Sequence, residues 1–396
     1  MVSEKMLALG THRSVIREIA AFADQRKLQI GAENVFDFSI GNPNVPAPQS
    51  VTDTLQKLLQ DTPAEVLHAY TAAPGDFKVR QAIAGYIQKT FHFAAREDYI
   101  YMTSGAAASL AITLTALAEE GDEVITFAPY FPEYQVYVTH TGAKFVAVPS
   151  AKDTFQIDPV ALENAINPHT KAVLVNSPNN PTGVVLNEES IDALCRILTE
   201  KSKAYGHPIY LIADEPYREI VYADAIVPYL PSCYQNTIVC YSFSKSLSLP
   251  GERIGYILVS PEAEGAEQIF AAVCGAGRAL GYICAPSLFQ KLIGHCLGQT
   301  ADIGIYDENR KLLYEALKDY GFEAVYPDGA FYLFLKSPET DASAFCEKAK
   351  QFDLLFVPSD SFGCPGYVRI AYCVTTDQIR RSLPAFKELA KLYFGE

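Results

Sequence analysis

A lysine and an arginine follow a predicted buried strand near the middle of the chain. The apolar, β-branched run 237–241 predicts the strand, and the small hydroxylated residues Ser242 and Ser244 follow it, then Lys245 and Arg253. An amine at the end of a buried strand is partly desolvated, which lowers its pKa and makes it a usable nucleophile and base. Hydroxyls and a guanidinium are the groups that a phosphate needs. The segment is typical either of a phosphate-binding catalytic loop or of a solvated turn.

Two other predicted strands also lead into polar side chains. The apolar run 209–213 ends at Asp214, and the strand expected at 171–175 is followed by a breaker segment that contains Asn180. A strand that is apolar throughout is covered on both faces, as in a parallel α/β sheet. The carboxyl ends of such strands form one binding edge, so we expect Asn180, Asp214 and Lys245 to lie close together.

A third segment could hold an anion. The strand expected at 99–103 runs into Ser104-Gly105-Ala106, which opens a helix to about residue 118. Free N–H groups at a helix N-terminus bind phosphate. Small residues also permit ordinary helix–sheet packing, and the segment is not a Walker or dinucleotide fingerprint, so both interpretations stay open.

Strands and helices alternate along most of the chain, which predicts an α/β fold. The expected strands are 36–40, 99–103, 123–127, 144–148, 171–175, 209–213, 237–241, 254–259, 322–325, 330–335, 354–358 and 367–372. We expect a large domain over 46–305, with a mostly parallel central sheet flanked by helices. A smaller mixed α/β domain follows over 306–396, and the N-terminal arm and helix over 1–45 are assigned to it.

The bulk composition excludes several classes of partner. The chain has 396 residues, and its formal net charge of −14 repels nucleic acid and anionic membrane surfaces. Nine cysteines without Cys-x-x-Cys spacing favour reduced thiols in the cytoplasm, and seven scattered histidines suggest no metal site. Residues 1–20 lack the continuous apolar core and cleavage site of a secretion signal, and no apolar run approaches membrane-spanning length. We therefore expect a soluble cytoplasmic protein.

Three motifs occur together in one order. They are Asn180-Pro181-Thr182-Gly183, Asp214-Glu215-Pro216-Tyr217, and Ser242-Phe243-Ser244-Lys245 followed by Arg253. Together they resemble the class I/II aminotransferases, enzymes of the aspartate aminotransferase fold (PLP-dependent transferase fold type I). The likeness covers about residues 39–369. It implies the cofactor pyridoxal 5′-phosphate and transfer of an amino group between an L-amino acid and a 2-oxo acid by a ping-pong mechanism.

The resemblance implies roles for residues around the cofactor ring. Lys245 matches the Schiff-base lysine, which also carries a proton during the reaction. Asp214 matches the carboxylate that keeps the pyridine nitrogen protonated. Tyr217 and Asn180 match donors to the ring oxygen, and Tyr130 matches the aromatic residue that stacks on the ring face.

Further matches concern the phosphate and the substrate. The phosphate cup is matched by Ser242, Ser244, Arg253 and the N–H groups of Gly105 and Ala106. Tyr70 resembles a tyrosine that reaches the phosphate of the neighbouring subunit, which implies a homodimer with shared active sites. Arg369 matches the arginine that grips the substrate α-carboxylate, with Asn180 and Gly41 beside that carboxylate.

Two segments depart from the family pattern. Some bacterial aspartate aminotransferases carry a lysine in the phosphate-loop segment that helps to hold the distal carboxylate of the substrate, and here the stretch is Ala106-Ala107-Ala108. Late in the small domain, 358–363 replaces a Pro-Gly that often precedes Phe-Gly. The first departure weakens an aspartate or glutamate assignment, and neither touches the cofactor.

Two other functions remain open on the same residues. A carbon–sulfur β-lyase would use the same cofactor and lysine but expel a leaving group from the substrate. A non-catalytic cofactor-binding module of a transcription regulator would carry an appended DNA-binding domain, which the short N-terminal extension and the negative charge disfavour.

Overall fold

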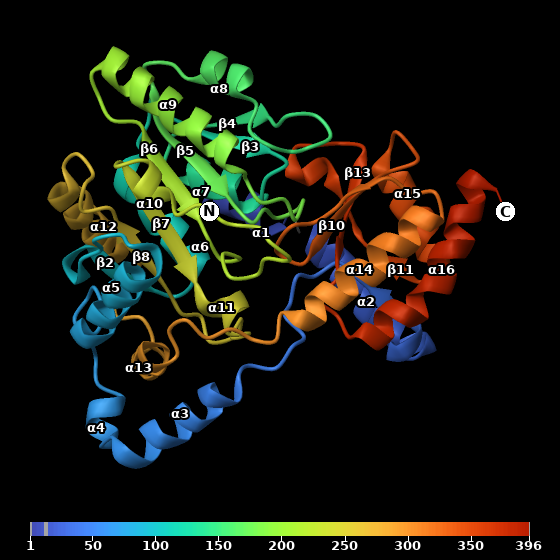
Figure 1. Ribbon diagram of the computed structural model, residues 1–396, viewed down its shortest axis with the longest axis horizontal. Coiled ribbons are helices and arrows are strands. Elements are labelled where there is room, and N and C mark those ends of the chain that lie inside the picture. The colour runs from blue at the N-terminus through green and yellow to red at the C-terminus, as the bar shows by residue number, and fades with distance from the viewer. Residues whose placement is uncertain (1, 12–14, 396) are drawn as a thin grey trace.

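The computed structural model describes residues 2–11 and 15–395. Its larger sheet, on the left in Figure 1, has seven strands in the order β2-β8-β7-β6-β5-β3-β4. In that order the strands are β2 (Ile100–Thr103), β8 (Gly255–Val259), β7 (Thr237–Ser242), β6 (Tyr210–Asp214), β5 (Thr170–Asn176), β3 (Glu123–Ala128) and β4 (Lys144–Pro149). All neighbours run parallel except β8, which is antiparallel to both β2 and β7. The α/β class and the mostly parallel sheet are confirmed.

Helices cover both faces of this sheet. Successive side chains of a strand point to opposite faces, so an apolar strand has apolar side chains to bury on each face. One face packs against α5 (Phe77–Phe91), α8 (Pro159–Ala165), α9 (Glu188–Tyr205) and α13 (Ser287–His295). The other face packs against α6 (Ala106–Leu117), α7 (Glu133–His140) and α12 (Ala266–Leu280). These two layers exclude water from the strands, so a polar group at a strand end is desolvated on both sides.

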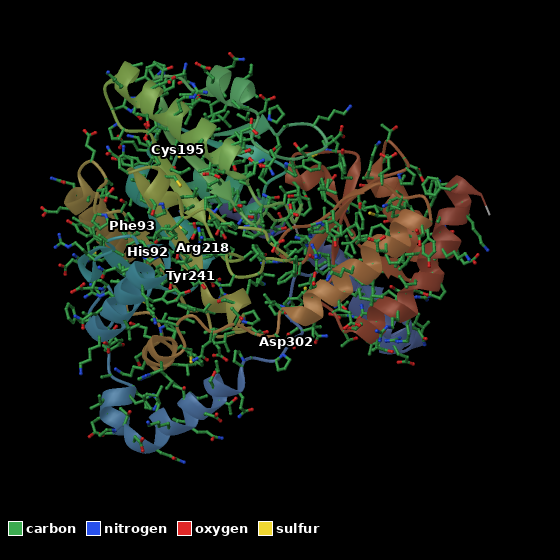
Figure 2. The ribbon with its side chains drawn as sticks, in the orientation of Figure 1. His92, Phe93, Cys195, Arg218, Tyr241 and Asp302 are labelled. Carbon is green, nitrogen blue, oxygen red and sulfur yellow. The ribbon has the colours of Figure 1, made fainter. Side chains whose placement is uncertain are left out.

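Helix α9 illustrates how the sequence sets an element. The Asn187 side chain accepts a hydrogen bond from the N–H of Ser190 and so caps the first turn. Apolar residues three and four apart then face the sheet, and Cys195 lies among them in the core (Figure 2). Gly206 ends the helix in the left-handed conformation, at a φ of 74°.

A smaller sheet lies on the right in Figure 1. Its antiparallel order is β12 (Val357–Pro358), β13 (Tyr367–Ala371), β10 (Tyr332–Lys336) and β9 (Ala324–Val325). Its helices are α14 (Gly304–Asp319), α15 (Ala342–Ala349) and α16 (Thr376–Phe394). Phe331, Phe345 and Phe386 are fully buried in the core between them.

The N-terminal segment packs on these C-terminal elements. Strand β1 (Phe36–Asp37) pairs parallel with β11 (Leu354–Leu355), and α2 (Val15–Ile30) buries Ile19 and Ala23 against the same region. The strand expected at 36–40 is shorter than predicted, because the Asp37 side chain accepts the N–H of Ser39 at 3.1 Å. Strand β1 and α2 thus contact the C-terminal elements, whereas Lys5 of the segment before them donates to the carbonyl of Thr139 in α7. The assignment of residues 1–45 to the smaller domain and the boundary at 305 stay predictions.

The remaining elements are short or peripheral. Helices α3 (Gln49–Asp61) and α4 (Ala64–Leu67) form an arm that extends away from the larger body (Figure 1). The others are α1 (Glu4–Thr11), α10 (Leu230–Cys233), α11 (Phe243–Ser246) and 3₁₀ turns at Ala32–Asn34, Glu97–Tyr99, Lys350–Phe352 and Ser359–Phe362. Within the described ranges, no helix has the length and apolar character needed to cross a lipid bilayer.

Candidate active site

A cavity of about 300 Å³ lies at the carboxyl ends of β5, β6 and β7, where the larger sheet meets the smaller one. Its walls include many of the residues singled out from sequence: Gly41, Ala106, Asn180, Asp214, Tyr217, Ser242, Ser244, Lys245, Arg253 and Arg369. The expectation that polar side chains from successive strand ends converge is met at this edge.

Lys245 reaches the cavity from a single helical turn. Strand β7 ends at Ser242, whose hydroxyl accepts the N–H of Ser244 at 3.2 Å and so turns the chain into α11. The Lys245 Nζ donates to the carbonyl of Gly41 at 2.7 Å. Burial lowers the pKa of the amine to about 8, an effect that Arg253 and Arg369 reinforce and Cys373 opposes. An appreciable fraction of Lys245 is therefore a neutral nucleophile near neutral pH.

Asp214 offers one free carboxylate oxygen to the cavity. Its Oδ2 accepts from the Tyr134 hydroxyl at 2.5 Å, whereas Oδ1 is buried with no partner among the described residues. Desolvation raises the pKa of Asp214 to about 7; the hydrogen bond from Tyr134 opposes this rise, and the charge of Glu215 adds to it. A buried carboxylate with an empty oxygen is costly unless a cationic N–H meets it. A protonated pyridine nitrogen is a group that fits this place.

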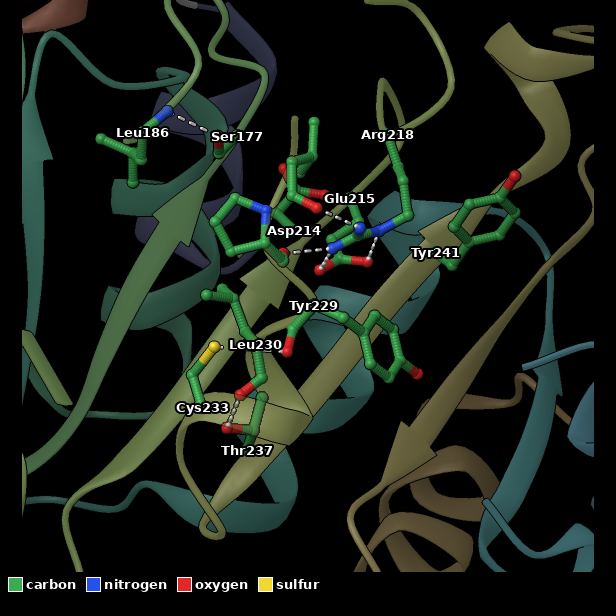
Figure 3. Close-up of polar contacts among 12 residues, drawn as sticks. Ser177, Leu186, Asp214, Glu215, Arg218, Tyr229, Leu230, Cys233, Thr237 and Tyr241 are labelled. Carbon is green, nitrogen blue, oxygen red and sulfur yellow. Dashed lines mark hydrogen bonds and ion pairs between the residues drawn. The ribbon is translucent and has the colours of Figure 1, made fainter. Parts of the chain in front are cut away.

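The neighbouring acid is neutralised on the other side of the strand end. Glu215 is buried and forms two 2.5 Å hydrogen bonds to the guanidinium of Arg218 (Figure 3). Arg218 also donates to the carbonyls of Val227 and Pro228. Because Arg218 compensates Glu215, Asp214 is left as the carboxylate that a bound cation can satisfy.

Backbone-to-side-chain contacts hold the strand ends together. The Asn176 side chain donates to the carbonyl of Asp214 at 2.8 Å and accepts the N–H of Asn180 at 2.7 Å. The Asn180 Oδ1 in turn accepts from Arg369 at 3.0 Å. Since its oxygen is occupied, Asn180 presents its amide N–H₂ as a donor.

The opposite end of the cavity is built for an anion. Gly105 precedes the first turn of α6 at a φ of 87°, and a Cβ placed there would lie 2.6 Å from an Arg253 nitrogen. Arg253 donates to the Ser244 hydroxyl at 3.2 Å, and the Ser242 and Ser244 hydroxyls are 2.8 Å apart. Gly105 is not in the cavity wall, but its lack of a side chain lets the guanidinium approach the free N–H groups of α6.

Arg369 forms the third polar wall, on β13 of the smaller sheet. Its side chain is buried and donates to the carbonyl of Ser39 at 2.6 Å as well as to Asn180. Its guanidinium carbon lies 4.7 Å from the ring centre of Tyr332 and 5.1 Å from that of Phe362. A guanidinium held in this way presents a fixed fork to a carboxylate.

Besides Gly105, two residues singled out from sequence do not line the cavity of this chain. The Tyr130 ring packs edge-on against Phe145 and beside Gly363, and the neighbouring residue, Phe131, lines the cavity instead. Phe131 is therefore a further candidate for the stacking aromatic, and the role expected of Tyr130 stays a prediction. Tyr70 is 94% exposed in the segment after α4 and does not line the cavity.

Three aromatic residues of the site were missed from sequence: Phe131, Tyr134 and Tyr332. Tyr134 holds Asp214, and the Tyr332 hydroxyl lies 2.9 Å from that of Tyr217. Phe131 and Tyr134 stand in the run 130–134, where an apolar packing role is equally compatible with the pattern. Tyr332 lies in a strand of the smaller sheet, and its place at the site follows only from the tertiary fold.

Comparisons with known proteins agree with this geometry. The family model for aminotransferase class I and II matches residues 33–386. The aspartate aminotransferase of Thermotoga maritima is 29% identical over 98% of this chain and 99% of its own length. A crystal structure of an aminotransferase from Eubacterium rectale is 55% identical, with a TM-score of 0.97 over 100% of this chain and 99% of that one. Thermus thermophilus aspartate aminotransferase with maleate is 25% identical, with a TM-score of 0.86 over 98% and 100% of the two chains.

The relatives are aminotransferases, which favours amino-group transfer over β-elimination and over the regulator module. The free oxygen of Asp214, the amine of Lys245 and the anion-binding end fit the ring, aldehyde and phosphate of pyridoxal phosphate. The chain therefore belongs to the class I and II aminotransferases, and it is a pyridoxal-phosphate-dependent enzyme.

Proposed function

We propose that the cavity binds pyridoxal phosphate with its ring nitrogen at Asp214, its aldehyde carbon at Lys245 and its phosphate at the N-terminus of α6. The observation that supports this orientation is the buried Oδ1 of Asp214, which has no partner among the described residues, in a cavity that Ser244 and Arg253 also line. Phe131 takes the role of the ring-stacking aromatic, because it lines the cavity and Tyr130 does not.

The cofactor, when bound, supplies an aldehyde for the amino group and a protonated ring that withdraws electrons from the substrate α-carbon. Lys245 would hold the aldehyde carbon through Nζ, and the same nitrogen, when free, would carry a proton. Asp214 holds the proton on the ring nitrogen by charge. Burial keeps the pKa of Tyr217 well above its ordinary value, so its hydroxyl stays protonated and donates beside Asn180.

Arg369 binds the α-carboxylate of both substrates in the ping-pong cycle. Asn180 and the carbonyl of Ser39 hold its fork, and the carbonyl of Gly41 lies within reach of Lys245 on the same side. An amino acid and a 2-oxo acid share this carboxylate, so one arginine serves both halves of the reaction.

The cavity wall favours an amino donor with an uncharged side chain. Its cations among the described residues are Lys245, Arg253 and Arg369, and each already has a partner in the scheme above. The rest of the cavity wall includes the apolar side chains of Ile16 and Leu110. A second carboxylate would be desolvated there without a counter-charge.

We further propose a homodimer in the cytoplasm. The α3–α4 arm exposes Leu59, Val66 and Tyr70, an apolar surface that a second copy would cover, and Tyr70 would then reach the phosphate of the partner's site. All nine cysteines, which lie within the described chain, are free thiols, as a reducing compartment maintains them.

Replacing Lys245 with alanine tests the assignment of the reactive amine. The variant should bind the cofactor but lose turnover by about 1000-fold or more, since both the nucleophile and the proton carrier are removed. Lys203→Ala, on the exposed side of α9, is the matched control and should retain normal turnover. Near-normal turnover of the Lys245→Ala variant would contradict the proposal.

A further inference from the structure

Tyr332, which has no assigned role in the scheme above, contacts three parts of the site at once. Its hydroxyl lies 2.9 Å from the Tyr217 hydroxyl, and its ring lies against the Arg369 guanidinium. A Cβ added at Gly41 would overlap the Tyr332 hydroxyl, so the absence of a side chain at Gly41 is what makes room for it. The residue is 2% exposed and lines the cavity.

Only one of the two hydroxyl protons can lie in the hydrogen bond between Tyr332 and Tyr217. Both phenols remain protonated at neutral pH, because burial raises the pKa of Tyr332 to about 12 and keeps that of Tyr217 well above its ordinary value. Two protonated hydroxyls in contact share one hydrogen bond, in which one donates and the other accepts. The accepting hydroxyl keeps its own proton free for a third group.

The surroundings determine which hydroxyl donates. The titratable groups that act on Tyr332 are Arg369 on β13, Cys373 just beyond that strand, and Tyr217. In the proposed orientation Tyr217 uses its only proton on the ring oxygen of the cofactor, so the hydrogen bond between the two hydroxyls runs from Tyr332 to Tyr217.

We infer that Tyr332 is a positioning residue: its hydroxyl donates to the Tyr217 oxygen and so directs the Tyr217 proton into the cavity, toward the ring oxygen of the bound cofactor. This inference rests on the proposed cofactor orientation. Donation from Tyr332 also polarises the Tyr217 hydroxyl, and chained hydrogen bonds strengthen one another in this way. Tyr217 is thereby a stronger donor than an isolated tyrosine.

The test is the pH titration of the visible absorption band of the cofactor-loaded enzyme, measured without substrate. In Tyr332→Phe the ring still packs on Arg369, but Tyr217 loses its donor and stabilises the negative ring oxygen less. The proton whose loss changes the visible band is then held more tightly. The midpoint of the titration should therefore rise by about half a pH unit.

A double-mutant cycle shows whether Tyr332 acts through Tyr217. In the Tyr217→Phe background, the Tyr332→Phe change should produce no further rise, because the hydroxyl that transmits the effect is gone. Incorporation of 3-fluorotyrosine at position 332 keeps both the ring and the hydroxyl but makes the hydroxyl more acidic. The midpoint should then move in the opposite direction, to lower pH.

Tyr372→Phe is the matched control. Its hydroxyl lies 3.4 Å from that of Tyr222 in a second buried tyrosine pair of the smaller unit, and neither residue lines the cavity. Its midpoint should equal that of the wild type. The inference would be overturned if the titration midpoint of Tyr332→Phe were unchanged or lowered. It would also be overturned if Tyr332→Phe raised the midpoint equally in the wild type and in the Tyr217→Phe variant. Absence of any visible band in the loaded wild type would instead overturn the proposed cofactor orientation.

Discussion

Asp214 is the residue whose charge depends most directly on the cofactor. Its pKa of about 7 in the folded protein lies above the ordinary value of about 4 for an unfolded chain. Between these two pH values the folded state binds the additional proton, so the free energy of unfolding of the cofactor-free protein falls as pH rises. Above pH 7 the buried carboxylate is charged and uncompensated, and a protonated ring nitrogen would remove that cost.

We therefore expect the cofactor to raise the thermal midpoint more at pH 8 than at pH 5. In Asp214→Asn this difference between the two pH values should shrink, because asparagine is neutral at both. Glu219, whose burial also raises its pKa to about 7, is present in both proteins and cancels in the comparison. Calorimetry of the free and loaded forms at the two pH values measures the effect; an equal pH dependence in the variant would contradict the role of Asp214.

At this scale, the sequence identified the residues that follow strands but not all the aromatic ones. Lys245, Asp214 and Asn180 are polar groups directly after apolar runs, and the sheet brings them to one edge. Tyr130 and Phe131 are adjacent aromatics, and which of them faces the cavity depends on how the backbone leaves β3. Tyr332 carries no local signal, since its partners Tyr217 and Arg369 are distant in sequence.

The junction between β2 and α6 is the element that the phosphate requires. Gly105→Ala would place a Cβ 2.6 Å from an Arg253 nitrogen and force alanine into a backbone conformation with a φ of 87°. We expect the affinity for pyridoxal phosphate to fall about tenfold or more, whereas the weaker binding of pyridoxal, which has no phosphate, should change less.

Gly85→Ala provides the matched control within a helix. Gly85 lies inside α5, with no atom within 4 Å of an added Cβ, so alanine there should stabilise the protein by about 0.5–1 kcal/mol. Fluorescence titration of both variants with both ligands compares them. Equal losses for pyridoxal and its phosphate in Gly105→Ala would show general disruption rather than a lost phosphate site.

The order of elements and the mostly parallel character of the larger sheet were predictable, and the direction of one strand was not. The expected strands between 99 and 259 agree with β2 to β8 to within one residue at each end, because apolar runs bounded by breakers mark buried strands. Strand β8 runs antiparallel to β7 and β2, which the apolar pattern cannot specify. The expected strand 354–358 is divided into β11 and β12, which pair with different partners.

At the scale of the whole molecule, the proposed dimer makes each site depend on two chains. Lys245→Ala and Tyr70→Ala should each impair their own homodimers. A mixed dimer would combine Lys245 of one chain with Tyr70 of the other and contain one intact site. Refolding the two variants together should raise activity above the average of the separate samples, at a cofactor concentration too low to load the Tyr70→Ala homodimer. Activity equal to that average would contradict shared sites.

The proposed reaction requires this cavity to hold pyridoxal phosphate and to transfer an amino group on it. The most direct measurement is the visible absorption spectrum of the purified protein, loaded with pyridoxal phosphate and then mixed with single L-amino acids. We predict a yellow band that an amino acid bleaches, with one equivalent of its 2-oxo acid released, and phenylalanine or leucine acting faster than aspartate. If no band formed after addition of the cofactor, or no amino acid bleached it, the account of this site would be wrong.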